Sequence, residues 1–566
     1  MTEIRATSTD MPAFEAPGKG PWELESTHFG RPITAIAQKS FCEGFVRGFK
    51  EGTERYGLLL SHLKPGISNG FMYNQPVPVG APEGAMGPPP KPVMMLLSRV
   101  HPQMRKRINT AVVAFAEKRW RADLAIWDEV DKPAAIARHR AIQAVDVTTL
   151  SDAELAEHVS TCAANCTESN YLHHKFTIPA CLPVGDFLAG AHAWTGASFG
   201  ELMGLLRGRS TISRGFAAEE LDLAAKALTT SDDAQAVLAG GGPSEQTLAA
   251  LAAHPEVGPE ITAYLDAVRW RCVGYDIGDA AAGELPDVLL ETLRSSLLDS
   301  GQTGEDDAGL AAVRDLVPPE HRDDFDDRLG EVRLMYRLRD ERGVFSDGWA
   351  TGLARRALLE TGRRLAAQGR LRDAAHGVDL SEAEAVAALR DGVGPDAAEI
   401  ERRFLWRTTH TIEDAPPFLN AMPSPPPPVE WLPERARRSA AAIDTFLFSL
   451  FGVPETPNTE TVLTGLAVNS GIYEGTARLV DQAADFGRIK QGDILVTRMT
   501  SPYFNVVLPL LGAIVTDRGG QLCHAAIVAR EYGIPGIVGT RDATRTITDG
   551  ARIRVDGSTG EVRLLG

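Results

Sequence analysis

The sequence lacks the features that mark secreted and membrane-spanning proteins. Only six cysteines occur among 566 residues, and their spacing matches neither a disulfide framework nor a paired metal-binding knuckle. No run reaches the ~18 consecutive apolar residues of a membrane span. The first twenty residues have neither the basic start nor the apolar run of a signal peptide. We therefore expect a cytoplasmic protein without a metal site.

Positive charge is also scarce. Lysine and arginine total 58 against 75 acidic residues, which gives a formal net charge of −17. Because this excess of negative charge repels nucleic acids and anionic lipid surfaces, we expect neither as a general partner. The composition, with 43% apolar and 23% charged residues, is typical of a globular chain large enough for several domains.

Stretches rich in proline and glycine divide the chain into segments of different composition. We expect a flexible lead over residues 1–21, followed by a mostly α-helical domain over 22–414 that is interrupted by a Pro/Gly-rich loop at 77–92. Residues 415–460 are predicted to form a proline-rich linker, one helix and a hinge. Short β-rich runs between glycine turns then predict a small α/β domain over 461–566.

Two helices within the large domain are predicted with particular detail. Apolar spacing indicates a helix over Asn109–Val130. Ser151 and Glu154 have the spacing of a capping box, so a further helix is expected to begin after Ser151. The region is thus predicted to be mostly α-helical.

The segment AIVTDRGGQLCHAAIVAREYGIPGIVGT, residues 513–540, is the most informative part of the sequence. It indicates a strand, a turn at Gly519 and Gly520, a helix that begins at His524, a stop at Gly533 and a second strand. Free backbone N–H groups at the start of a helix favour an anion. A neutral imidazole there is a suitable nucleophile and phosphoryl carrier. Taken alone, His524 could instead be a buried or capping histidine.

This segment closely resembles the active-site signature of the phosphohistidine swivelling domain. That domain is shared by phosphoenolpyruvate synthases, pyruvate phosphate dikinases and rifamycin phosphotransferases. The resemblance implies that His524 carries a phosphoryl group and that the domain swings between an ATP site and an acceptor site. It implies a phosphate-binding loop made by Gly519, Gly520 and Cys523.

The region in front distantly resembles the helical acceptor-binding domain of rifamycin phosphotransferases. The stretches concerned are WELESTHFGRPIT, ELMGLLRGRSTISRGF, ITAYLDAVRWRCVGYDIGD and YRLRDERGVFSDGWATGLARRALLETGRRLAAQGRL. By this resemblance Arg339 approaches the transferred phosphate, with Arg342 close behind. Gly343 stands where the resemblance leads us to expect a lysine, so the positive charge is altered or supplied elsewhere. Arg339 alone would also fit a solvated helix position.

No Walker A loop or recognisable ATP-grasp domain is found in the sequence. An acceptor domain beside a phosphohistidine domain resembles split enzymes such as phenylphosphate synthase and related hydroxyaryl dikinases. The resemblance implies a separate ATP-grasp subunit that uses ATP and Mg²⁺ to phosphorylate His524, with AMP and phosphate released overall. Because the sequence ends directly after the swivelling domain, we do not expect pyruvate as the acceptor.

The acceptor is expected to bind near residues 171–200, where histidines and aromatic side chains are densest. His173, His174, His192 and Trp194 are the candidate pocket residues, and a histidine could deprotonate a phenol. The same residues could simply fill a core. A small aromatic alcohol or phenol is the preferred acceptor, while a rifamycin-type antibiotic and a non-catalytic phosphocarrier remain the alternatives.

Overall fold

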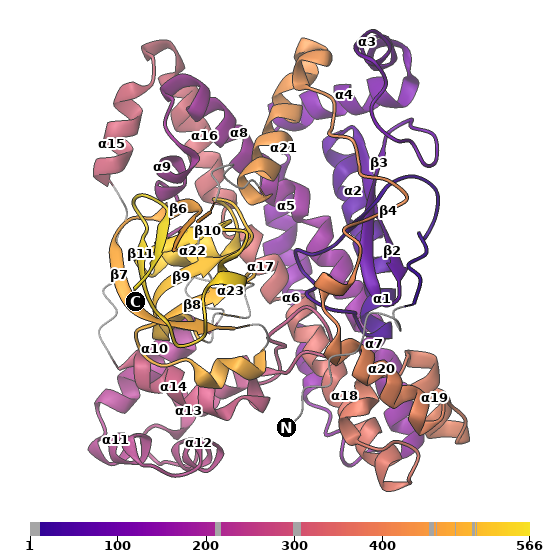
Figure 1. Cartoon of the computed structure of the whole chain (residues 1–566), viewed down its shortest axis with the longest axis vertical. Helices are drawn as coiled ribbons and strands as arrows, with labels where there is room; N and C mark the ends of the chain where they lie inside the picture. Colours follow the sequence, from indigo (N-terminus) through magenta and orange to yellow (C-terminus); the bar gives the residue numbers. More distant parts are fainter. Residues whose placement is uncertain are drawn as a thin grey trace.

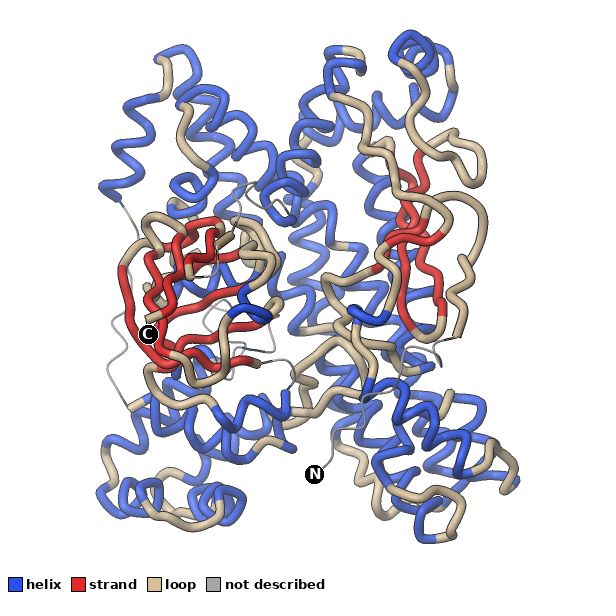
Figure 2. The backbone as a smooth tube through the Cα atoms, in the orientation of Figure 1, coloured by secondary structure: helices blue, strands red, loops and turns tan. Residues whose placement is uncertain are grey.

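The computed structural model describes residues 12–209, 217–297, 307–451, 458–459, 461–480, 483–500, 504 and 507–565. Helices make up most of the molecule and surround two separate β-sheets (Figures 1 and 2). None of the described helices combines the length and apolar character needed to cross a membrane. The multidomain, mainly helical organisation with a C-terminal α/β region agrees with the sequence-based prediction.

A four-stranded antiparallel sheet lies inside the region predicted to be helical. Its order is β2-β3-β1-β4, from strands Leu60–Ser68, Phe71–Pro78, Trp22–Leu24 and Phe418–Leu419. Asn69 and Gly70 have φ angles of 50° and 82° and connect β2 to β3 in a tight hairpin. The region predicted to be mostly helical therefore also contains three strands of a small sheet, and the fourth strand, β4, follows it.

Part of the expected flexible lead is held against this sheet. The indole N–H of Trp22 donates to the carbonyl of Gly18 at 3.0 Å, and the Gln75 amide donates to the carbonyl of Lys19 at 2.8 Å. Phe14 packs on Phe71 with ring centroids 5.8 Å apart. Residues 12–21 are thus ordered by the sheet, and residues 1–11 lie outside the described part of the chain.

The helices that flank the sheet form the half of the molecule drawn on the right of Figure 1. Those near the N-terminus are α1 Ala35–Ser40, η1 Phe41–Phe45, α2 Val46–Tyr56, α3 Lys91–Val100, α4 Pro102–Ala116, α5 Trp120–Ile126, η2 Trp127–Asp131 and α6 Lys132–Gln143. The helix predicted over 109–130 is in fact interrupted at Lys118, whose φ of 49° is left-handed.

Long helices connect the two halves. They are α7 Asp152–Lys175, α8 Thr177–Thr195, α18 Asp347–Ala367 and α21 Glu434–Phe451, with α19 Glu382–Asp391 and α20 Ala397–Thr409 packed beyond α18. The predicted capping box at the start of α7 is confirmed: Ser151 Oγ accepts from the Glu154 amide, and the Glu154 carboxylate accepts from the Ser151 amide.

Two further groups of helices lie on the left of Figure 1. The helical lobe, residues 217–297, contains α10 Ala218–Thr229, α11 Asp232–Ala239, α12 Ser244–Ala252, α13 Gly258–Val268 and α14 Pro286–Ser296. The second group contains α9 Phe199–Gly204, α15 Asp307–Leu316, α16 Arg322–Met335 and α17 Leu338–Val344.

Residues 461–565, the C-terminal domain, contain an eight-stranded mixed sheet in the order β5-β12-β11-β7-β8-β9-β10-β6. Strands β7, β8, β9 and β10 run parallel at its centre. The strands are β5 Val462–Thr464, β6 Leu466–Asn469, β7 Ile472–Leu479, β8 Asp493–Thr497, β9 Leu511–Thr516, β10 Gly536–Val538, β11 Arg552–Asp556 and β12 Glu561–Leu564, with helices α22 His524–Glu531 and α23 Ala543–Thr546.

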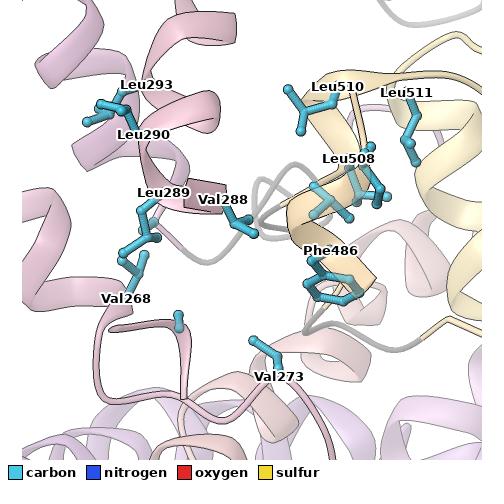
Figure 3. Packing of buried hydrophobic residues seen from close by; sticks show 14 of the residues in the cluster. Val268, Val273, Val288, Leu289, Leu290, Leu293, Phe486, Leu508, Leu510 and Leu511 are labelled. Atoms are coloured by element: carbon cyan, nitrogen blue, oxygen red, sulfur yellow. The ribbon is translucent and has the colours of Figure 1, made fainter. Parts of the chain in front are cut away.

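An apolar cluster joins the C-terminal domain to the helical lobe. Val288 and Leu289 of α14 belong to the same buried cluster as Phe486, Leu508 and Leu510 of the C-terminal domain (Figure 3). The C-terminal domain therefore lies between the helical lobe on one side and α9, α17 and α21 on the other (Figure 1).

The chain enters the C-terminal domain close to the end of α21. Asn458 donates to the carbonyl of Thr540 at 2.7 Å and accepts from the Thr464 amide at 2.9 Å, so it is already part of that domain. Most of the hinge predicted between Val453 and Thr461 lies outside the described residues.

Candidate functional site

His524 is the first residue of α22, which follows β9 through a short glycine-containing loop. Gly519 has a φ of 107°, and a Cβ there would lie 2.6 Å from the Cys523 sulfur, so only glycine fits this turn. Cys523 is the N-cap residue of α22. The strand, turn and helix predicted around His524 are confirmed, and they place its imidazole at a helix start.

The imidazole of His524 is held in its neutral form. Burial lowers the pKa of His524 to about 3, and the positive charge of Arg339 contributes to the decrease. Thr500 Oγ1 lies 2.9 Å from His524 Nδ1 and fixes the orientation of the ring. A neutral, oriented imidazole has the lone pair that nucleophilic attack on a phosphoryl group requires.

Arg339 of α17 brings positive charge to His524. Its side chain is 11% exposed, and its Nη1 atom is 3.8 Å from a carboxylate oxygen of Asp340. Among the described residues, its buried Nη1 atom has no hydrogen-bond acceptor. A buried guanidinium N–H without a partner is costly, and a phosphate oxygen would satisfy it with a charge-assisted hydrogen bond.

Arg342 lies on α17 about one helical turn after Arg339. Its Nη1 donates to the carbonyl of His173 at 3.2 Å and to Thr177 Oγ1 at 3.0 Å. Its buried Nε has no acceptor in the described part of the chain. Arg342 therefore connects the arginine beside His524 with the end of α7.

His173 and His174 end α7 beside these arginines. His173 Nδ1 is 3.0 Å from a carboxylate oxygen of Asp347, the first residue of α18. The two histidine rings stack with centroids 4.5 Å apart, and His174 meets the edge of Phe45 at 4.4 Å. Burial raises the pKa of Asp347 to about 7.

His192 and Trp194 do not join this group. His192 Nδ1 contacts the Ala197 carbonyl at 2.8 Å, and Trp194 stacks on His321 with centroids 5.0 Å apart. Both lie near the C-terminal end of α8, which runs from Thr177 to Thr195, and the His192 ring packs against Phe199. The structure thus separates the four predicted pocket residues into two groups.

Residues 25–28, which follow β1, also line the candidate site, and the sequence alone did not predict this position. His28 Nδ1 is 3.1 Å from Glu25, and its ring packs edge-on against Tyr275 at 5.0 Å. Ser26 accepts a hydrogen bond from Arg518 of the C-terminal domain. No short motif contains Glu25, Tyr275 and Asp347 together, because folding brings them from three distant segments.

The loop before His524 is docked on the end of α21. The Gly520 amide donates to the Leu450 carbonyl and the Leu522 amide to the Ser449 carbonyl, both at 2.8 Å. These bonds satisfy carbonyl groups that the end of a helix otherwise leaves unpaired. A Cβ on Gly520 would lie 2.4 Å from the Ser449 oxygen, so glycine is required for this docking.

No group of three or more His, Cys, Asp or Glu side chains in the described ranges is arranged to hold a metal ion. The features that could hold a phosphate are the helix start at His524, Arg339 and the loop glycines.

Comparison with known proteins agrees with this geometry. Residues 489–560 match the family described as the PEP-utilising enzyme, mobile domain. This range contains strands β8, β9, β10 and β11 and helix α22 with His524.

Similar proteins include phosphotransferases and phosphoenolpyruvate synthases. The chain is 32% identical over 253 residues to an uncharacterized phosphotransferase, YvkC, of Bacillus subtilis (strain 168), covering 45% of this chain and 28% of that protein. It is 30% identical over 323 residues to a rifampicin phosphotransferase of Streptomyces sp, covering 54% and 34% respectively. Phosphoenolpyruvate synthase of Pyrococcus furiosus is 44% identical over 108 residues, covering 19% and 13%.

The matched regions span about a third or less of the length of these relatives. The C-terminal region of the chain, with His524 at the start of α22, therefore matches the PEP-utilising enzyme mobile domain.

Proposed function

We propose that this protein is the acceptor-binding and phosphocarrier component of an ATP-dependent, dikinase-type phosphotransferase. In this proposal His524 receives a phosphoryl group and passes it to the hydroxyl of a small aromatic acceptor such as a phenol. The observation that carries the proposal is the placement of His524 beside Arg339, whose buried Nη1 lacks an acceptor among the described residues.

The electrostatics favour phosphoryl transfer over a purely structural role for His524. A structural histidine gains nothing from an adjacent buried arginine, because Arg339 and burial both disfavour its charged form. A phosphoryl group on the ring would bring negative charge to that same arginine and would be stabilised by it. The buried arginine would therefore stabilise a phosphorylated His524 more than an unmodified one.

The phosphoryl donor in this proposal is ATP with Mg²⁺, bound by a separate ATP-grasp subunit that releases AMP and phosphate overall. The relatives named as phosphotransferases support the transfer chemistry. Two backbone hydrogen bonds join the His524 loop to α21 among the described residues. So few bonds are compatible with a loop that separates from α21 to receive a phosphoryl group.

The acceptor would bind where Arg342, His173 and the segment Glu25–Phe29 meet. Aromatic side chains from Phe41, Phe45 and Tyr275 surround this place and favour an aromatic molecule. A hydroxyl on that molecule would face the arginine pair on α17.

The test is a labelling experiment with β-³²P-ATP, this chain and an ATP-grasp protein encoded beside it, followed by a chase with a panel of phenols. We expect acid-labile label on the wild-type chain, no label on His524→Ala, and release of label to at least one phenol. His192→Ala serves as the matched histidine control and should label normally.

Three results would contradict the proposal in different ways. Label that forms on His524 but never moves to a phenol or to a rifamycin would favour a phosphocarrier that serves another protein. Label that moves only to a rifamycin would identify an antibiotic phosphotransferase component. An unlabelled wild-type chain in the presence of its partner would mean that His524 is not a phosphoryl carrier.

A further inference from the structure

We propose that His173 and Asp347 form a general-base pair that removes the proton from the acceptor hydroxyl during transfer from His524. This inference rests on the proposed function, because it needs a hydroxyl acceptor at the same site. It assigns the base to one of the two histidines at the end of α7 and adds an orienting carboxylate from α18.

The pair has the geometry of an oriented base. His173 Nδ1 and Asp347 Oδ1 are 3.0 Å apart, and their side chains are only 16% and 11% exposed. With Nδ1 directed at the carboxylate, the lone pair of the neutral ring is on Nε2. The carboxylate fixes this tautomer and stabilises the imidazolium that forms when Nε2 accepts a proton.

His174 is a poorer candidate, although it stacks directly on His173. Its Nδ1 lies 3.4 Å from the Thr177 hydroxyl, and its ring packs against Phe45. Among the described residues no carboxylate contacts it. His174 therefore supports the position of the His173 ring rather than sharing its chemistry.

Gly343 leaves room beside the pair. A Cβ at this position would lie 3.4 Å from His173 Cε1 and 3.7 Å from the Asp347 carboxylate oxygen. A long side chain on Gly343 would fill the space next to both groups. The glycine, which stands where the sequence comparison led us to expect lysine, thus keeps one face of the base open to a ligand.

The charged groups around His173 come from several elements. Arg342 of α17 donates to the His173 carbonyl, Asp347 of α18 contacts its ring, and His28 of the segment after β1 completes the group. Burial lowers the pKa of His173 well below its ordinary value, and Arg342 and His28 lower it further. The ring is therefore neutral at rest, and the Asp347 carboxylate is the group that would stabilise the charge gained when Nε2 accepts a proton.

The transfer step balances with these groups. The acceptor oxygen forms a bond to phosphorus as its proton moves to His173 Nε2. The bond between phosphorus and the His524 ring breaks, and its electron pair stays on the ring nitrogen. With the other ring nitrogen, Nδ1, protonated toward Thr500 Oγ1, His524 leaves as a neutral imidazole. The new phosphate ester is then opposite Arg339.

The test uses the full chain phosphorylated on His524 with phosphoramidate, which transfers its phosphoryl group directly to imidazoles. Single-turnover loss of the phosphoryl group is then followed with phenol and with 4-nitrophenol as acceptors. The variants are His173→Asn and Asp347→Asn, and His192→Asn is the matched control on α8. Circular dichroism shows whether each variant is folded, and the label on His524 is quantified before each reaction.

We expect His173→Asn to slow transfer to phenol by about 100-fold, since positioned bases contribute on that order. Asp347→Asn should slow it as well, by a smaller factor. Transfer to 4-nitrophenol should stay within about threefold of wild type, because this phenol is largely ionised at neutral pH and needs no base. His192→Asn should transfer to both acceptors at the wild-type rate.

Equal loss with both phenols would show that His173 has only a structural role and would overturn the base assignment. Unchanged transfer to phenol in His173→Asn would overturn it too. In both cases the proposed function would stand. If phosphorylated wild-type protein transfers to neither phenol, the aromatic acceptor of the proposed function is wrong, and the base assignment falls with it.

Discussion

Among the described residues, Arg339 and Arg342 each carry a buried guanidinium nitrogen without a hydrogen-bond acceptor, which costs free energy. Proteins rarely keep such groups unless something else supplies the acceptor. Because the two arginines follow each other on α17 between His524 and His173, an anion placed there would meet both. In the proposed function, that anion is the phosphoryl group during its transfer.

Arg339→Lys is expected to leave phosphorylation of His524 intact but to slow transfer to an acceptor by about 100-fold. Lysine keeps the charge but lacks the planar fork that directs several N–H groups at phosphate oxygens. Single-turnover transfer of labelled phosphoryl is the measurement. Arg363→Lys, an exposed arginine paired with Glu360, is the control, and an equal effect there would argue against a specific role for Arg339.

Substitutions at Gly343 should separate helix stability from chemistry. Gly343→Ala places a Cβ at ordinary contact distance from His173 and should raise the free energy of unfolding by up to ~1 kcal/mol through helix propensity. Gly343→Val adds methyl groups toward the His173–Asp347 pair and should slow transfer to phenol at least about tenfold. Urea unfolding and single-turnover rates measure the two effects. Wild-type transfer by Gly343→Val would contradict an open face there.

At the scale of single residues, the sequence predicted those site residues that lie close together along the chain. His524, Gly519 and Cys523 lie within one short motif, so their pattern could be recognised without a fold. The contact of His173 with Asp347 requires α7 and α18 to pack side by side, and nothing in either segment alone indicates it. The placement of Arg339 next to His524 likewise depends on how the C-terminal domain docks.

At the scale of whole elements, local rules were most reliable where a helix has a strong start signal. Ser151 and Glu154 form both bonds of the predicted capping box. The missed hairpin also had a signal, since Asn69–Gly70 is a dipeptide that favours tight β-turns between strands. The strands on either side of this dipeptide, β2 and β3, alternate only weakly between buried and exposed residues, so they lack a clear strand pattern.

Ser151→Ala should reduce the free energy of unfolding by about 1 kcal/mol, because it removes the acceptor for the Glu154 amide at the start of α7. Chemical denaturation followed by circular dichroism measures the change. Thr161→Ala, on an exposed face in the middle of the same helix, is the matched control and should not destabilise the protein. A similar loss in both variants would mean that the cap is not the cause.

At the scale of the molecule, apolar clusters hold the C-terminal domain on two sides. Val288 of α14 points toward the C-terminal domain in Figure 3, where Phe486 and Leu508 belong to the same cluster. On the other side, Leu522 and Ile527 of the C-terminal domain share a buried cluster with Phe446 of α21.

Val288→Asp should release the C-terminal domain from the helical lobe, because an unpaired carboxylate in an apolar contact is strongly unfavourable. We expect a larger radius of gyration in small-angle X-ray scattering and faster proteolysis between α21 and β5. Leu223→Asp, on the exposed surface of the same lobe, is the control. Unchanged scattering in a folded Val288→Asp protein would show that the cluster does not hold the domain.

The end of α21 also sets the reach of the phosphoryl carrier. Phe451 ends that helix and Asn458 is already bonded into the C-terminal domain, so seven residue steps join the two bodies. A chain of that length spans at most roughly 25 Å. After the His524 loop separates from Ser449 and Leu450, Asn458 still cannot move farther than this chain length from the end of α21. To reach a phosphoryl donor, the C-terminal domain must therefore rotate about Asn458 rather than move far from α21. In the proposed function, a donor subunit has to bind close enough to α21 for His524 to reach it by this rotation.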